Sequence, residues 1–131
     1  MSIRTATLNG VATIEIARPE KKNAITQAMY AQMAEALDAA KADDAVRAVL
    51  ITGQPGIFTS GNDLEDFMKR PPQDMGSPVF RFLEAASEAQ KPLVAAVNGP
   101  AVGIGTTLLL HCDLVYAGDD ARFRRGAVSR Q

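Results

Sequence analysis

The sequence has 131 residues, of which 47% are hydrophobic and 22% charged, and its net charge is −1. This balance is typical of a single globular domain, and it argues against a dedicated surface for nucleic acid or a membrane. No apolar run reaches the length of a membrane span, and residues 1–10 lack the apolar stretch of a signal peptide. The single cysteine, Cys112, excludes an internal disulfide and fits a reducing compartment, so we expect a cytoplasmic protein.

The N-terminal residues predict a β-hairpin with arms at residues 3–8 and 11–17. Asn9-Gly10 joins the arms, and this dipeptide favours a type I′ turn because both positions tolerate a positive φ angle. Apolar residues alternate along the second arm with the period of a strand. These residues are Ala12, Ile14 and Ile16. A charged loop, residues 18–23, follows the hairpin.

A helix is predicted over residues 26–42, where apolar residues recur at helical spacing. Thr26 is the expected N-cap. The recurring residues, which we assign to the core, are Met29, Met33, Leu37 and Ala40. The next apolar run, residues 46–52, is short and bounded by charge and glycine, which suits a buried parallel strand.

The rest of the chain continues to alternate between predicted helices and strands. Ser77-Pro78 is a typical helix start, and Asn98-Gly99-Pro100 is a typical turn. In chain order we expect a helix over 62–68, a helix from 78 to about 89, a strand over 93–97, a helix over 104–112 and a strand over 114–117. This alternation predicts an α/β layer with right-handed crossovers. Residues 122–131 contain four arginines and no amphipathic period, so we assign them no stable structure.

Two glycine-rich turns, residues 60–64 and 99–107, share one design. Each follows a buried strand and opens a helix, and ligands of α/β sheets gather at the carboxyl ends of strands. Helix N-termini offer unpaired N–H groups and a partial positive charge, so two such turns facing one point make an oxyanion hole. A tight structural corner or a phosphate cradle remains an alternative for either turn. The Walker lysine and the third glycine of a dinucleotide fingerprint are both absent.

Three stretches carry a family resemblance. They are Arg18-Pro19 with Asn23-Ala24-Ile25, Phe58-Thr59-Ser60-Gly61-Asn62-Asp63-Leu64, and the run from Lys91 to Gly103. In order and spacing they resemble the motifs of the crotonase (enoyl-CoA hydratase/isomerase) superfamily over residues 5–123, and most of all its Δ3,Δ2-enoyl-CoA isomerase branch. The resemblance implies an α/β fold of the crotonase type, a ββα spiral, here truncated to its N-terminal part.

The resemblance also implies roles for single residues. The backbone N–H groups of Asn62 and Ile104 would form the oxyanion hole for the thioester oxygen of an acyl-CoA. Ala24 would lie in the loop beside the CoA moiety, and the residues around the two turns would contact the substrate. The further substrate-binding positions are Ser60, Gly61, Asp63, Leu64, Gly103, Gly105 and Thr107. No metal and no separate cofactor is expected, because coenzyme A is part of the substrate.

By resemblance, the expected reaction moves a double bond of an enoyl-CoA from the 3- to the 2-position. Hydratases of the family use two glutamates, and Thr107 stands where the first is expected. Because a hydroxyl cannot serve as a carboxylate base, we prefer isomerisation to hydration. Hydration remains an alternative, and so does a non-catalytic acyl-CoA-binding domain, since the catalytic carboxylate of the isomerase branch lies beyond residue 131.

The resemblance divides the chain into a core domain, residues 1–123, and a basic tail, residues 124–131. The tail departs from the family pattern, which we interpret as a truncation or a change of reading frame. Family members of full length form trimers or hexamers, so the expected partners are an acyl-CoA thioester and, at full length, further copies of the chain.

Several polar side chains have structural interpretations. Asp63 is expected to support the first turn, and Asp113 to anchor the turn before the last strand. His111 and Cys112 fall in an apolar segment and are assigned to the core. Glu65 and Asp66 are weak candidates for a base, because they lie one turn into a short helix.

Overall fold

The computed structural model describes residues 2–69, 76–102, 112–117 and 121–124. In chain order its elements are β1 (Ile3–Leu8), β2 (Val11–Ile16), the 3-10 helix η1 (Pro19–Lys21), α1 (Gln27–Ala42), β3 (Ala48–Thr52), α2 (Leu64–Lys69), α3 (Pro78–Ser87), β4 (Leu93–Val97), β5 (Pro100–Val102), β6 (Leu114–Ala117) and β7 (Arg122–Arg124). The helix predicted over 104–112 falls almost wholly outside the described residues.

The hairpin prediction is confirmed. Strands β1 and β2 pair antiparallel from Ile3 opposite Ile16 to Leu8 opposite Val11. The φ angles of Asn9 and Gly10 are 53° and 82°, the positive values that a type I′ turn requires.

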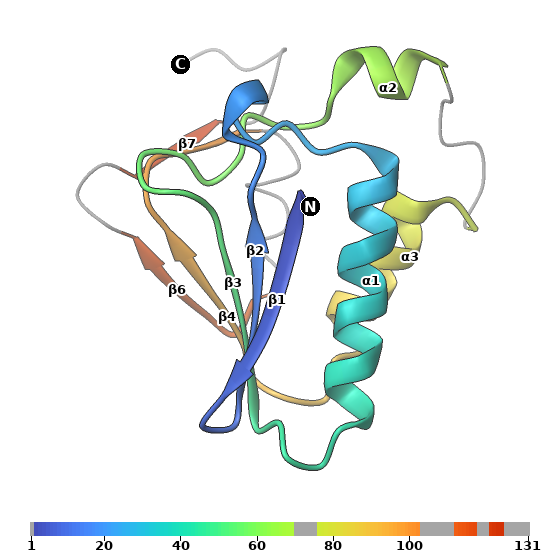
Figure 1. The fold of residues 1–131 in the computed structure, drawn as a ribbon, viewed down its shortest axis with the longest axis vertical. Coiled ribbons are helices and arrows are strands. Elements are labelled where there is room, and N and C mark those ends of the chain that lie inside the picture. The colour runs from blue at the N-terminus through green and yellow to red at the C-terminus, as the bar shows by residue number, and fades with distance from the viewer. Residues whose placement is uncertain (1, 70–75, 103–111, 118–120, 125–131) are drawn as a thin grey trace.

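A five-stranded sheet forms the centre of the fold, in the order β1-β2-β3-β4-β6. All pairs after the hairpin are parallel, with Val49 opposite Leu93 and Ala95 opposite Val115. Figure 1 shows α1 and α3 side by side on one face of this sheet, and the two helices contact each other along their length. The predicted α/β layer with buried parallel strands is therefore confirmed.

The core lies between this face of the sheet and the two helices. The methionine stripe of α1 belongs to it, as predicted, and Thr26 caps the helix by accepting a hydrogen bond from the Met29 N–H at 3.2 Å. Each fully buried apolar side chain of this kind contributes roughly 1.5–3 kcal/mol through the hydrophobic effect. The largest apolar residues with almost no exposure include Ile14, Ile16, Ile25, Met33, Ile51, Phe58 and Phe82.

The structure corrects the prediction near the C-terminus. Residues 122–131 were expected to lack stable structure, yet Arg122–Arg124 form β7 and pair in parallel with β5. Strand β5 itself begins at Pro100, where only a turn was predicted. Both strands are three residues long, and they pair with each other across about twenty residues of sequence. Such short strands show no local period from which the sequence could predict them.

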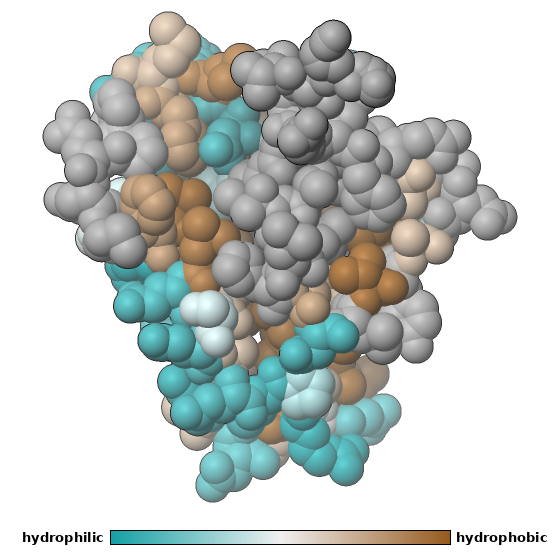
Figure 2. Space-filling view, turned by 180° about the vertical axis from the view of Figure 1, so that it is seen from behind, coloured by the Kyte–Doolittle hydropathy of each residue, from teal (hydrophilic) through white to brown (hydrophobic). Residues whose placement is uncertain are grey.

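Figure 2 shows hydrophilic side chains gathered over the lower end of one face of the molecule. The hairpin turn at this end also exposes two apolar residues, Leu8 and Val11. Among the helices that the structure describes, none combines the length and apolarity needed to cross a membrane.

Candidate active site

The carboxyl ends of β2, β3 and β4 place three loops at one end of the sheet. In Figure 1 these loops, residues 17–26, 53–63 and 98–99, gather at the upper end together with η1, α2 and β5. Parallel strands require this arrangement, because their carboxyl ends share one edge. Any ligand site built from the two glycine-rich turns therefore belongs at this end.

Gly99 begins the turn at residues 99–107 and lies against the loop that leads to the turn at residues 60–64. Its φ angle is +98°, and a Cβ atom at this position would collide with the carbonyl group of Gly56 and the nitrogen of Ile57. Only glycine fits both the backbone conformation and the space. The two loops consequently touch at Gly56 and Gly99.

The backbone around Asn62 forms a short parallel bridge with Ile25. The Ile25 N–H donates to the Gly61 carbonyl at 2.9 Å, and the Asp63 N–H donates to the Ile25 carbonyl at 2.8 Å. Since neighbouring residues of an extended segment point their N–H groups to opposite sides, the Asn62 N–H is directed away from Ile25. It has no hydrogen-bond acceptor within the part of the chain that the structure describes.

Asn23 fastens the loop after β2 to the loop after β3. The side chain is fully buried, and its Nδ2 donates to the carbonyls of Ile16 at 2.9 Å and Phe58 at 3.1 Å. Its Oδ1 accepts from the Arg18 N–H at 2.7 Å. The residue has a φ angle of 56°, a left-handed conformation that Asn adopts more readily than most residues.

Thr59 adds a second connection between the same loops. Its buried hydroxyl donates to the Asn23 carbonyl at 2.7 Å and accepts from the Gly61 N–H at 3.1 Å. Next to it, the Ser60 N–H donates to the Lys22 carbonyl at 3.2 Å. The predicted site residues Ser60 and Gly61 thus lie beside the loop that holds Ala24, although sequence reasoning gave Thr59 no role.

Asp63 is ionised and holds the turn. The backbone N–H of Asp66 and, after it, the Arg18 guanidinium keep the pKa of the Asp63 carboxyl below its ordinary range. Asp66 donates to Oδ1 at 2.9 Å, and Arg18 Nη1 lies 2.7 Å from Oδ2. The predicted supporting role of Asp63 is confirmed, but its charged partner Arg18 was not foreseen.

The two carboxylates of α2, Glu65 and Asp66, also have partners. Asp66 Oδ2 accepts from the Gln27 N–H at 2.8 Å, at the start of α1. Glu65 is exposed and lies 3.8 Å from the Lys69 ammonium. Leu64, predicted to contact substrate, has 73% of its surface exposed at the beginning of α2.

Tyr30 contacts the side chain of Asn62, the candidate oxyanion residue. Its ring is fully buried, packs edge-on against Phe67 and lies tilted against Phe82. Its hydroxyl donates a hydrogen bond to Oδ1 of Asn62. Burial raises the pKa of Tyr30, so the phenol remains a donor at neutral pH. The sequence analysis missed this residue, because the helical period indicates that Tyr30 is buried but not which group its hydroxyl contacts.

The second half of the predicted site is not among the described residues. Gly103, Ile104, Gly105 and Thr107 all lie outside them, as does His111. The last residue described before this segment is Val102, at the end of β5.

Cys112 and Asp113, which precede β6, have the structural roles predicted for them. Asp113 Oδ2 accepts from the Leu93 N–H at 2.8 Å, which anchors the turn. Cys112 packs against the core, and burial, followed by the charge of Asp113, raises the pKa of its thiol to about 11. Within the described ranges, no three His, Cys, Asp or Glu residues are grouped to hold a metal ion.

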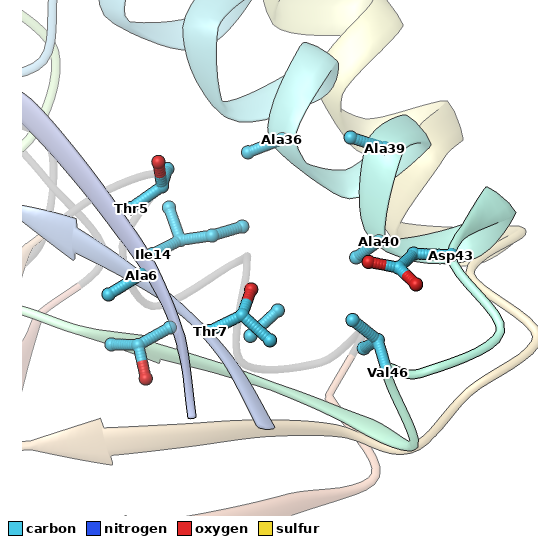
Figure 3. A pocket seen from close by; sticks show the side chains of 11 residues that line it. Thr5, Ala6, Thr7, Ile14, Ala36, Ala39, Ala40, Asp43 and Val46 are labelled. Carbon is cyan, nitrogen blue, oxygen red and sulfur yellow. The ribbon is translucent and has the colours of Figure 1, made fainter. Parts of the chain in front are cut away.

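One open groove lies away from these loops, between the hairpin and the C-terminal half of α1, with a volume of about 340 Å³. Figure 3 shows Thr5, Thr7 and Ile14 on the hairpin side and Ala36, Ala39 and Ala40 on the helix side. Its lining is small and mostly neutral, with Asp43 as its one ionisable residue among those described.

Comparison with known proteins identifies the family. A family model described as enoyl-CoA hydratase/isomerase matches residues 6–128. Enoyl-CoA delta isomerase 2 of Homo sapiens is 43% identical over 88% of this chain and 31% of its own length. The mitochondrial enoyl-CoA hydratase of Pongo abelii is 34% identical over 92% of this chain and 42% of its own length. The chain therefore spans less than half the length of these relatives.

The solved structures agree with the sequence match. OdaA of Pseudomonas aeruginosa superposes with a TM-score of 0.91 at 58% identity, covering 94% of this chain and 50% of that one. The names of the matched proteins include isomerases, hydratases and dehalogenases of CoA compounds, so the family hosts several reactions. With a fold and a sequence that match over nearly all of its residues, the chain belongs to the enoyl-CoA hydratase/isomerase family and has the crotonase-type fold.

Proposed function

We propose that this chain supplies half of an acyl-CoA thioester site, in which the N–H groups of Asn62 and Ile104 hold the thioester oxygen. The observation that supports the proposal is the direction of the Asn62 N–H, which faces away from Ile25 and has no acceptor within the described residues. It lies at the carboxyl end of the sheet, where the loop before it contacts the turn at Gly99. The CoA compounds in the names of relatives support the substrate class.

The chemistry that such a site favours is enolate formation. A proton next to a thioester carbonyl is removed only if the negative charge that develops on oxygen is stabilised. Fixed N–H donors provide this, and removing one donor from a comparable site costs roughly 3–4 kcal/mol of transition-state stabilisation. The ladder with Ile25 holds the Asn62 peptide in place before the substrate arrives.

Within this chemistry we propose isomerisation of 3-enoyl-CoA to 2-enoyl-CoA. Thr107 in place of a glutamate argues against the two-glutamate route of hydration. The base must be a carboxylate other than Asp63, because that group is ion-paired with Arg18 and has a lowered pKa. Asp66 is committed to the start of α1.

The test is an assay with 3-hexenoyl-CoA and 2-hexenoyl-CoA. Conjugation of the double bond with the thioester raises the ultraviolet absorbance, whereas hydration of 2-hexenoyl-CoA lowers it. Isomerisation predicts a rise with the first substrate and no change with the second. A fall with the second substrate would contradict the isomerase proposal and favour a hydratase.

The structural use of Asp63 and Asp66 also supports a second candidate, a non-catalytic acyl-CoA-binding domain. Calorimetric titration with hexanoyl-CoA, a saturated thioester, separates this candidate from the first. Binding of hexanoyl-CoA without turnover of either enoyl-CoA would support the binding domain. A chain that binds neither hexanoyl-CoA nor the enoyl-CoA substrates would exclude both candidate functions.

A further inference from the structure

The hydroxyl of Tyr30 is held where it can act on the oxyanion turn. The residue lies in the first turn of α1, 32 residues before Asn62, and none of its surface is exposed. Phe67 of α2 and Phe82 of α3 fix its ring, with centroid distances of 6.1 and 5.5 Å. Three helices therefore determine the position of one phenol oxygen.

The phenol hydroxyl donates a hydrogen bond to the side chain of Asn62, the residue whose backbone N–H is the proposed donor. Asn62 is fastened on both flanks, through the Gly61 carbonyl and the Asp63 N–H, which both bond to Ile25. These bonds fix the Gly61–Asn62 peptide, whose carbonyl faces Ile25 and whose N–H faces the other way, but they do not hold the Asn62 side chain. The hydrogen bond from Tyr30 to Oδ1 holds that side chain from the protein interior and so resists movement of the turn at Asn62.

We propose that Tyr30 is a positioning residue, whose hydroxyl holds the Asn62 side chain and thereby aims the Asn62 N–H at the thioester oxygen. The inference rests on the proposed function of Asn62. Its physical basis is preorganisation, since a donor stabilises a developing charge best when it needs no reorientation. The hydroxyl is suited to this role because burial keeps it protonated and its ring cannot move without repacking Phe67 and Phe82.

A purely structural role for Tyr30 makes a different prediction. If the hydroxyl only satisfies a polar atom, Tyr30→Phe changes the free energy of unfolding and leaves a bound thioester unaffected. If the hydroxyl positions Asn62, the variant keeps its aromatic packing but polarises a bound thioester carbonyl less. The carbonyl itself is therefore the reporter that separates the two roles.

The experiment uses the ¹⁵N-labelled chain and hexanoyl-CoA with ¹³C at the thioester carbonyl. In the wild-type protein we expect hexanoyl-CoA to shift the Asn62 amide signal, free CoA to leave it in place, and binding to move the carbonyl resonance downfield. In Tyr30→Phe we expect the carbonyl shift to fall by about half and Kd to rise about fivefold, the effect of losing one ordinary hydrogen bond.

Two further variants complete the test. Thr52→Val removes a hydroxyl that donates to the Ala96 carbonyl and not to Asn62, and it should leave the carbonyl shift unchanged. If Tyr30 acts through Asn62, the double variant Tyr30→Phe/Asn62→Ala should polarise the carbonyl no less than Asn62→Ala alone.

The outcomes distinguish the two proposals. A normal wild-type response with an equal carbonyl shift in Tyr30→Phe would overturn the positioning role and leave the function of Asn62 intact. An Asn62 amide that does not respond to hexanoyl-CoA in the wild-type chain would overturn the proposed function, and the positioning role with it.

Discussion

The guanidinium of Arg18 and the carboxylate of Asp63 form an ion pair at 2.7 Å across 45 residues of sequence. Their side chains retain only 17% and 15% of their exposure. The same Arg18 nitrogen donates to the Ala24 carbonyl at 3.1 Å. One arginine thus ties the loop after β2, the proposed CoA-side residue Ala24 and the start of α2 into a single unit.

Replacing Asp63 with Asn should therefore destabilise the fold. The amide cannot pair with Arg18 as a carboxylate does, which leaves a sheltered guanidinium without its charge partner. We expect the free energy of unfolding to fall by about 1–3 kcal/mol, measured by urea denaturation at neutral pH. Glu65→Gln is the control, because its pair with Lys69 is exposed and should contribute less than about 0.5 kcal/mol. Equal losses in the two variants would contradict the importance of burial.

The same pair predicts a pH dependence of stability. The pKa of Asp63 is lowered in the folded state from its ordinary value of 3.8, so the unfolded chain takes up this proton at a higher pH than the folded one. The stability from this group is therefore complete above pH 3.8 and is lost as pH falls through the lowered pKa. The stability difference between wild type and Asp63→Asn should be constant near neutral pH and shrink in acid. A difference that grows in acid would contradict the sign of the shift.

Glycine at position 99 should be indispensable for a reason that Gly56 does not share. Both residues have a positive φ angle, +98° and +90°, but a Cβ at Gly56 would meet no atom within 4 Å. Gly56→Ala should therefore cost only the backbone strain, about 1–2 kcal/mol. Gly99→Ala adds a collision with the Gly56 backbone and should cost several times as much in thermal or urea unfolding. Similar losses in both variants would show that the two loops do not pack as described.

The elements that could be predicted from the sequence are those with a local signal. Asn9-Gly10 specifies its own turn, and Met33 lies in the core because the helical period places it there. The family motifs point to Asn62 in the same way, since their residues are adjacent in sequence, and the role of Asn62 stays a prediction. A signal of this kind needs no knowledge of the remaining chain.

The contacts that could not be predicted join residues far apart with no period between them. No residue near Tyr30 in the sequence indicates that its hydroxyl bonds to Asn62. Likewise, no residue near Arg18 indicates that its guanidinium pairs with Asp63. The β5–β7 pairing is similar, because Pro100 and Arg122 lie far apart in the sequence and no local period marks either strand. In each case the geometry depends on how separate elements pack, which a local pattern does not contain.

Asn23 provides the last prediction, because its side chain makes three hydrogen bonds and none of its surface is exposed. Asn23→Ala would leave the Phe58 carbonyl and the Arg18 N–H without this partner, and the Ile16 carbonyl with only the Gln54 amide at 3.3 Å, so we expect a loss of about 3 kcal/mol in the free energy of unfolding. Lys22→Ala is a matched control, since Lys22 has almost the same φ angle, 53° against 56°, on an exposed residue.

Asn23→Gly separates the hydrogen bonds from the backbone conformation. Glycine adopts a positive φ angle without strain, so it should recover the conformational part of the loss, about 1 kcal/mol, and nothing of the hydrogen-bonded part. Lys22→Ala should change stability by less than about 0.5 kcal/mol, as ordinary surface substitutions do. If Asn23→Gly restored wild-type stability, the left-handed conformation alone would explain the asparagine, and the three hydrogen bonds that join the two loops would contribute nothing to holding Ala24 beside the proposed oxyanion turn.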